Sequence, residues 1–141
     1  MLRSVKARRP VIAVAVAAAL PVAGCGLKVQ SADLFQLQRT GQGQTLTLLV
    51  SDGGTIRCNG APSQPISDAL LIQARDLADN LAKDATAKLS LPPGHNSVYT
   101  YKVKLQDGTI SFADTSANAH HELAAAELFA AQTAQGVCGH T

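Results

Sequence analysis

The chain of 141 residues contains no tryptophan, one methionine, and only two tyrosines and three phenylalanines. Surfaces that stack on sugar rings or nucleic-acid bases need several aromatic side chains close together. The composition therefore argues against a carbohydrate-stacking or base-stacking platform. It also leaves leucine, isoleucine, valine and alanine to fill most of the core.

The chain also lacks an apolar run long enough to cross a membrane comfortably. The uncharged stretch Pro10–Leu27 is interrupted near its end by Pro21, Gly24 and Gly26, whereas a spanning helix needs ~20 mostly apolar residues. Basic residues precede this stretch, at Arg3, Lys6, Arg8 and Arg9. A basic segment, a short apolar core and small residues in this order are typical of a secretory signal peptide.

The apolar core is followed by Val22-Ala23-Gly24-Cys25, which resembles the lipobox of bacterial lipoproteins. The resemblance implies that residues 1–24 are cleaved and that Cys25 carries acyl chains such as palmitate. The protein would then be anchored to the cell membrane on its extracytoplasmic face. Residues 25–32 would form a short tether that reaches at most ~25 Å beyond Cys25. The pair Arg8-Arg9 leaves both the general secretory and the twin-arginine export routes open.

Cleavage at this point would reverse the sign of the net charge. The full chain carries a net charge of +2, but four of its twelve Lys and Arg residues precede Cys25, which leaves eight against ten Asp and Glu residues. Lys102 and Lys104 alternate on one predicted strand, a pattern more typical of a solvated face than of a phosphate-binding track. We therefore expect no nucleic-acid partner.

Lipidation of Cys25 would leave Cys58 and Cys138 as a pair in an oxidising compartment. Such a pair predicts a disulfide. A reactive or metal-binding thiol is the alternative. The chain has no CxxC spacing and no histidine near Cys58, although His140 follows Cys138 closely.

Alternating apolar and polar residues predict five strands, and helical spacing predicts two helices. The strands are expected at 33–40, 45–51, 55–59, 97–106 and 109–114, with turns at Gly41–Gly43, Asp52–Gly54 and Asp107-Gly108. One helix is expected from the N-cap Ser67 to about Ser90. A second is expected from the N-cap Asn118 to Gly136, with Leu123, Leu128, Phe129 and Ala131 on its apolar side.

The order βββ-α-ββ-α indicates an α+β fold, with an antiparallel five-stranded sheet and two helices on one face. The length of residues 33–141 suits a single domain. An all-β barrel is the alternative, but it leaves the two helical stretches unexplained.

The strongest candidate for a metal motif is His120-His121-Glu122, because a histidine followed by glutamate on a helix can begin a zinc metalloprotease motif. That motif needs a second histidine four residues after His121, where this chain has Ala125. Gly60–Gln64 contains Ser63 but does not match the G-x-S-x-G pattern of a nucleophile elbow. We therefore expect no enzymatic activity, no catalytic residue, no cofactor and no metal site.

Two resemblances cover most of residues 33–135. The strand-and-turn segments Asp33–Gly41, Val98–Gly108 and Thr109–Asp114 resemble uncharacterised actinobacterial lipoproteins, and more loosely the emfourin group, which are small protein inhibitors of thermolysin-like metallopeptidases. The second resemblance implies inhibition of such a peptidase. This chain departs from the emfourin pattern in its lipobox, its third strand and its cysteine pair, so no inhibitory residue is carried over.

Together these patterns predict a membrane-anchored, non-enzymatic domain that binds a partner in the cell envelope, with peptidase inhibition as the alternative. The partner would be an envelope protein or a peptidase. Loops at the ends of a sheet are frequent binding sites. The candidate contact loops are Gly41–Gly43, Asp52–Gly54 and Pro92–Asn96.

Overall fold

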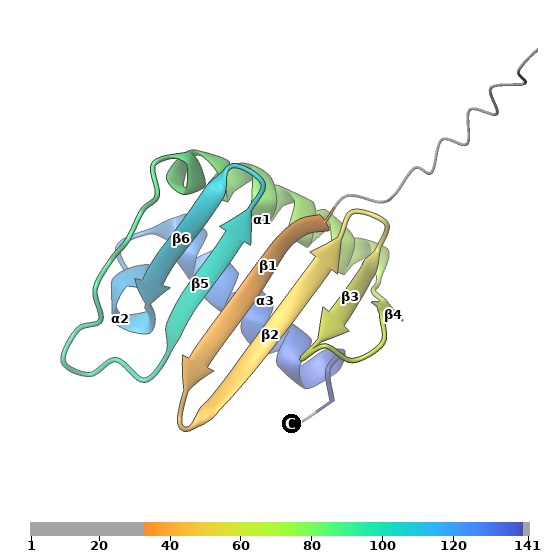
Figure 1. The fold of residues 1–141 in the computed structure, drawn as a ribbon, viewed down its shortest axis with the longest axis horizontal. Coiled ribbons are helices and arrows are strands. Elements are labelled where there is room, and N and C mark those ends of the chain that lie inside the picture. The colour runs from red at the N-terminus through yellow and green to blue at the C-terminus, as the bar shows by residue number, and fades with distance from the viewer. Residues whose placement is uncertain (1–32, 140–141) are drawn as a thin grey trace, which may run out of the picture.

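The computed structural model describes residues 33–139, which form one antiparallel sheet of six strands together with three helices (Figure 1). The strands are β1 (Asp33–Gly41), β2 (Gln44–Ser51), β3 (Thr55–Cys58), β4 (Gln64–Pro65), β5 (Thr100–Leu105) and β6 (Gly108–Ala113). The helices are α1 (Asp68–Thr86), α2 (Asp114–Ala117) and α3 (His121–Gly136). The strand order across the sheet is β4-β3-β2-β1-β5-β6. The expected signal peptide, Cys25, the tether and His140 lie outside the described residues.

The α+β class and the antiparallel sheet are confirmed, but the element count differs by one strand and one helix. Strand β4 has only two residues, which pair with Thr55 and Ile56 of β3, and two residues are too few to show an alternating pattern. Helix α2 is a single turn that begins directly where β6 ends. The prediction of Asn118 as the N-cap of the last helix is therefore wrong. Asn118 ends α2, and α3 begins at His121 after the N-cap residue His120.

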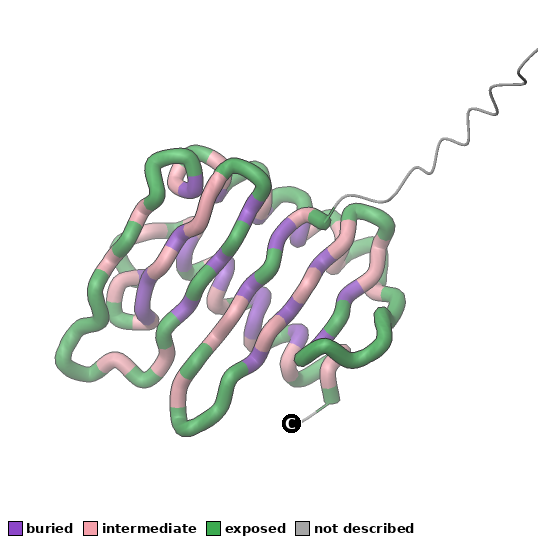
Figure 2. Tube along the Cα trace, in the orientation of Figure 1, coloured by how far each residue is buried: buried purple, intermediate pink, exposed green. Residues whose placement is uncertain are grey.

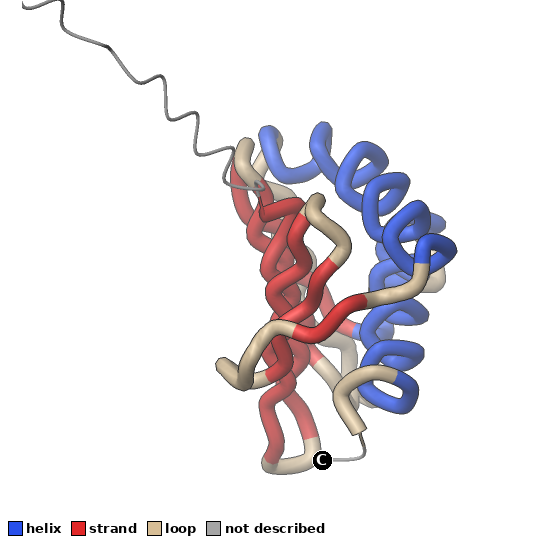
Figure 3. Tube along the Cα trace, turned by 90° about the vertical axis from the view of Figure 1, so that its right-hand side faces the viewer, coloured by secondary structure: helices blue, strands red, loops and turns tan. Residues whose placement is uncertain are grey.

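The sheet and the helices form two layers, with α1 and α3 on the same side of the sheet (Figure 3). Residues along β1, β2 and β5 alternate between buried and more exposed positions, as the colours of Figure 2 show. This alternation is the pattern expected when one face of a sheet is covered and the other faces water. The core lies between the layers, and its largest fully buried side chains include Phe35, Leu37, Leu48, Ile56, Leu81, Ile110, Phe112, Leu123 and Phe129.

Helix α1 begins as predicted but ends earlier than expected. The Ser67 hydroxyl accepts a hydrogen bond from the backbone N–H of Leu70 at 3.2 Å. At the other end, Leu89 N donates to Asp84 O and Lys88 N donates to Ala85 O. This is a Schellman motif, with Lys88 in the left-handed conformation at φ 53°. The chain then turns away, and Leu89–Leu91 hydrogen-bonds along the outer edge of β6 instead of continuing the helix to Ser90.

The apolar side of α3 is also rotated relative to the prediction. Leu123, Ala126, Phe129, Ala130 and Thr133 are buried, whereas Leu128 is 54% exposed and Ala131 is half-buried. The ring of Phe129 packs edge-on against that of Phe35 on β1, with centroids 5.5 Å apart. Because α3 is rich in alanine, its sequence periodicity is weak, and the fit of Phe129 into the core sets the helix rotation.

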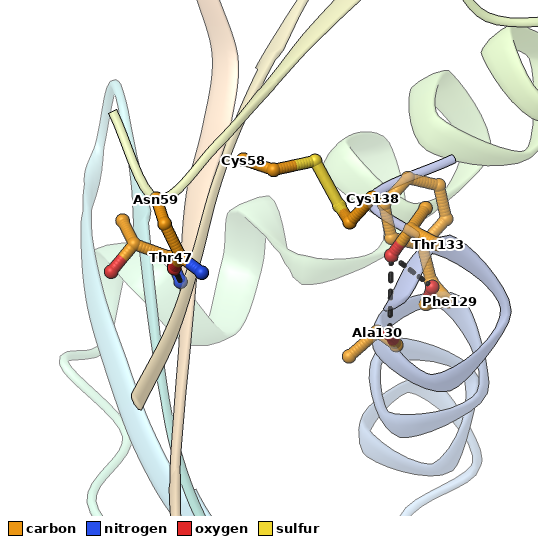
Figure 4. The surroundings of a disulfide bond; sticks show 7 residues. All are labelled: Thr47, Cys58, Asn59, Phe129, Ala130, Thr133 and Cys138. Carbon is orange, nitrogen blue, oxygen red and sulfur yellow. Dashed lines mark hydrogen bonds between the residues drawn. A yellow bond between two sulfur atoms is a disulfide. The ribbon is translucent and has the colours of Figure 1, made fainter. Parts of the chain in front are cut away.

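Cys58 and Cys138 form the predicted disulfide, which joins the end of β3 to the chain just after α3 (Figure 4). Their Cα atoms are 5.8 Å apart, and 80 positions separate them in sequence. Nearby in α3, the buried Thr133 hydroxyl donates to Phe129 O at 2.8 Å, so this polar group is satisfied inside the core. The disulfide therefore fixes the C-terminal end of α3 against the sheet.

Replacing both cysteines, as Cys58→Ala with Cys138→Ala, should lower the free energy of unfolding by about 4 kcal/mol. The reason is that closure of a loop of this length restricts the unfolded chain. Urea unfolding of the full chain measures the loss, and wild-type protein treated with reductant should show a similar one. An unfolding midpoint that neither change moves would contradict a structural role for the disulfide.

Candidate functional site

The predicted contact loops lie at opposite ends of the sheet (Figure 1). Asp33 pairs with Ser51, which places the turn Asp52–Gly54 beside the start of β1, at what we call the Asp33 end. Gly41 pairs with Gln44, and Thr40 pairs with Thr100. The turn Gln42-Gly43 and the loop that precedes β5, which includes Pro92–Asn96, therefore share the other end, which we call the Gly41 end.

At the Asp33 end, the turn after β2 is tied to helix α1. Arg75 Nε donates to Asp52 Oδ1 at 2.6 Å, and Arg75 Nη2 donates to the backbone oxygen of Asp52 at 3.1 Å. Both side chains are about half exposed, at 48% and 49%. Such an exposed ion pair contributes at most about 1 kcal/mol, but its contacts engage the polar groups that a partner would otherwise use.

At the Gly41 end, the carboxylate of Asp114 holds the chain that enters β5. Ser97 Oγ and Thr115 N donate to Oδ1 at 2.7 and 2.8 Å, and Val98 N and Tyr99 N donate to Oδ2 at 2.9 and 3.1 Å. Partial burial alone would raise the pKa of Asp114, but these four hydrogen bonds outweigh it and lower the pKa. The donors of this segment therefore bind a carboxylate, which explains why β5 begins at Thr100 and not at the predicted Ser97.

The Asp114 contacts fix the backbone of Tyr99, and a contact with the turn after β1 holds its ring. The Tyr99 hydroxyl donates to Gln42 Oε1 at 3.0 Å, which links the β5 segment to the turn between β1 and β2. Gly41 lies so close to this segment that a Cβ atom there would collide with the Val98 carbonyl oxygen and the Tyr99 ring. Glycine at position 41 is therefore what allows the two segments to approach.

Arg39 lies over the Tyr99 ring, with its guanidinium carbon 4.9 Å from the ring centroid. On β1 it follows Phe35 and Leu37 in the same alternation, so it points to the helix-covered side of the sheet. None of the hydrogen bonds or ion pairs within residues 33–139 uses its guanidinium. The cation is thus oriented by an aromatic ring and has no carboxylate partner among the described residues.

A cavity of about 290 Å³ opens beside this arginine. It lies at the Gly41 end, between the sheet and the last turn of α3, and is lined by Arg39, Gly41, Gln44, Thr45, Leu46, Asn59, Tyr99 and Ala134. The lining contains one cation, several neutral hydrogen-bonding side chains and no carboxylate. We call this cavity the Arg39 pocket.

A second polar cluster, of Tyr101, Glu127 and Asp114, lies near the same end. Glu127 Oε1 is buried without a hydrogen-bond partner among residues 33–139. Burial, and secondarily the charge of Asp114, raises the pKa of Glu127. Burial and the charge of Glu127 raise the pKa of Tyr101 to about 12. Burial therefore disfavours the charged form of Glu127 in the folded domain.

The other expected functional residues are arranged as follows. Lys102 and Lys104 are exposed on the uncovered face of the sheet, together with Arg57, as the solvated-face interpretation predicts. His120-His121-Glu122 forms the start of α3. No group of three or more metal-ligating side chains gathers within residues 33–139, and no helix there is long and apolar enough to span a membrane.

The sequence alone assigns none of the three predicted contact loops to an end of the sheet. Of the residues that line the pocket, only Gly41 belongs to one of those loops. In the sequence, Arg39 and Tyr99 are explained as ordinary strand residues, and Asp114 as the last residue of a predicted strand. One signal was available. Arg39 occupies the alternation position of two buried residues, and a charge at such a position calls for an explanation.

Glu127→Gln should stabilise the domain at neutral pH and not under acid conditions. Burial raises the pKa of Glu127 in the folded domain. While Glu127 is protonated in both the folded and the unfolded protein, it costs no stability. The free energy of unfolding then falls as pH rises through the folded pKa. Removing the charge should raise the free energy of unfolding by up to about 1 kcal/mol at pH 7 and hardly at all at pH 4.

Urea unfolding of the full chain at both pH values measures the difference. Glu122→Gln, in the first turn of the same helix, removes the same charge from a favourable helix position and should give no gain. An equal gain from Glu127→Gln at pH 4 and pH 7 would show that the buried charge is not its cause.

The geometry of the Gly41 end is the main guide to function, because the comparisons identify no relative. Protein-family models, curated proteins and solved structures were each compared with the chain, and none of them matches it.

Proposed function

We propose that the protein is a lipoprotein, anchored to the extracytoplasmic face of the cell membrane through Cys25, whose folded domain binds a protein partner of the cell envelope without catalysing a reaction. The single observation that carries the proposal is that the described chain enters at the Asp33 end, whereas the Arg39 pocket and two of the three predicted contact loops lie at the Gly41 end.

The distances support this arrangement. The short segment between Cys25 and Asp33 spans at most ~25 Å, so a lipid on Cys25 would keep the domain close to the membrane. Strand β1 has nine residues and runs from one end to the other, which corresponds to ~30 Å. An anchor at the Asp33 end would leave the Gly41 end free to face away from the membrane.

The contacts at the two ends support the same assignment. At the Asp33 end, Asp52 and Arg75 bind each other. At the Gly41 end, Asp114 holds the backbone in place, and Arg39 is left with donors that no described residue uses. A rigid scaffold that presents an uncommitted cation suits recognition of a partner.

Lipidation is tested by Cys25→Ala in the producing bacterium. Wild-type protein should sediment with the membrane and carry a diacylglycerol-modified N-terminus at residue 25 by mass spectrometry. The variant should remain an unlipidated precursor, because the modified thiol is absent. Detection of a diacylglycerol-modified N-terminus on the variant would disprove the lipobox assignment.

Partner binding is tested with a photo-crosslinking residue placed at exposed positions in intact cells. His95 and Asn96 probe the Gly41 end, and Gln106 and Asp107 are matched positions on the turn at the Asp33 end. We expect a discrete crosslinked protein from the first pair and not from the second, and its loss in the Cys25→Ala background. Equal crosslinking from both ends, or none, would contradict the proposal.

The alternative, inhibition of a thermolysin-like metallopeptidase, is tested separately with purified protein. Unchanged peptidase activity at a large molar excess of the full chain would exclude it. Stoichiometric inhibition would instead identify the partner as a peptidase.

A further inference from the structure

The chemistry of the Arg39 pocket indicates which group it binds. A guanidinium has five N–H donors in a fixed planar arrangement and is always protonated. In Arg39 none of these donors is used by another residue between 33 and 139. Elsewhere in the described chain, the guanidinium groups of Arg57 and Arg75 both bind oxygen atoms, of Ser63 and of Asp52. Arg39 therefore differs from them in having unused donors beside a cavity.

The orientation of Arg39 is set before any ligand arrives. Its guanidinium lies over the Tyr99 ring. The Tyr99 hydroxyl donates to Gln42, and the Tyr99 backbone N–H donates to Asp114. Stacking on an aromatic ring limits the conformations of the side chain while leaving the N–H edges of the planar group available. Preorganisation of this kind reduces the entropy lost on binding.

The charges around the cavity favour a ligand group with one negative charge. Arg39 is the single cation in the lining, and no carboxylate competes for it there. Ala134 contributes the wall formed by the last turn of α3, which ends at Gly136. The carbonyl end of a helix carries partial negative charge, so a doubly charged phosphate is less suitable than a carboxylate. A planar carboxylate can also accept two parallel hydrogen bonds from one guanidinium.

The size of the Arg39 pocket and its neutral polar lining favour the end of a peptide chain as the ligand. The volume, about 290 Å³, lies at the lower limit of the ~300–1,000 Å³ usual for ligand sites. Gln44 adds a neutral polar side chain, and Asn59 adds a side-chain amide whose oxygen accepts from Thr47 N. Such groups suit amides, and Leu46 adds an apolar surface. An amide-linked chain that ends in a carboxylate combines these features.

We propose that the Arg39 pocket binds the terminal carboxylate of a peptide, with Arg39 as the bidentate donor and Tyr99 as the residue that positions it. This inference deepens the proposed function, on which it rests, by naming the group of the partner that enters the site. The binding chemistry itself can be measured on purified protein, without reference to membrane anchoring.

The test is a titration of the isotope-labelled full chain in detergent, followed by amide NMR. The probes are N-acetyl-Ala-Ala with a free carboxylate, the same dipeptide as its C-terminal amide, and acetate. We expect saturable shifts at Gly41, Gln44 and Asn59 with the free acid, and affinity about tenfold weaker or more for the amide. Acetate should bind more weakly than the dipeptide acid, because it reaches only Arg39.

Variants then assign the binding to Arg39. Arg39→Gln should weaken binding of the free acid about tenfold or more, and Arg39→Lys should also weaken it, because lysine cannot make the planar paired contact. The matched control Arg57→Gln removes an exposed cation from the other side of the sheet and should leave affinity within about twofold. The amide spectrum of each variant shows whether it is folded.

Tyr99 provides a second test that does not change the charge of the pocket. Tyr99→Phe keeps the ring under Arg39 and should bind nearly as well as wild type, whereas Tyr99→Leu should bind more weakly. Equal affinities for the acid and the amide, or an affinity that Arg39→Gln leaves unchanged, would overturn the carboxylate site. Acetate binding as tight as that of the dipeptide would overturn the assignment to a peptide end. If the carboxylate site holds and crosslinking in cells fails, only the proposed cellular role is wrong.

Discussion

The burial of a single sheet face against α1 and α3 is the constraint from which the other features follow. Most alternate residues of the long strands are apolar on that face, from Phe35 and Leu37 on β1 to Val103 and Leu105 on β5. The same alternation directs Arg39 to the covered side. An isolated charge cannot be buried in a hydrophobic core without a large cost, so the core ends at this point. The guanidinium lies on Tyr99 at the edge of the core, and a cavity opens beside it.

Two long-range contacts give this edge its shape. The disulfide Cys58–Cys138 holds the C-terminal end of α3 near β3, which brings Ala134 into the wall of the pocket. On the opposite side, Asp114 binds the segment that leads into β5 and thereby positions Tyr99. The pocket thus depends on segments from the first, middle and last parts of the described chain. The disulfide and the Asp114 hydrogen bonds that shape the pocket are therefore also contacts that stabilise the fold.

The sequence predicts those features that arise from local patterns. Period-two alternation identified the five longer strands, the N-cap Ser67 identified the start of α1, and the two cysteines indicated their pairing. Features that depend on distant segments were missed. Lys88 ends α1 in a left-handed conformation that glycine usually adopts, and Leu128 points outward because Phe129 packs against Phe35. The site was missed for the same reason, since Asp114, Tyr99 and Arg39 meet only in the folded chain.

The proposed role depends on Arg39 being held in place at the Gly41 end before a partner binds. The most direct measurement is the proton NMR spectrum of the Arg39 side chain in the full chain without ligand. A guanidinium and δ-methylene that lie over the Tyr99 ring should resonate clearly upfield of unstructured arginine, and Tyr99→Leu should remove this shift while Tyr99→Phe preserves it. Arg39 resonances at unstructured positions in the wild-type protein would contradict the account.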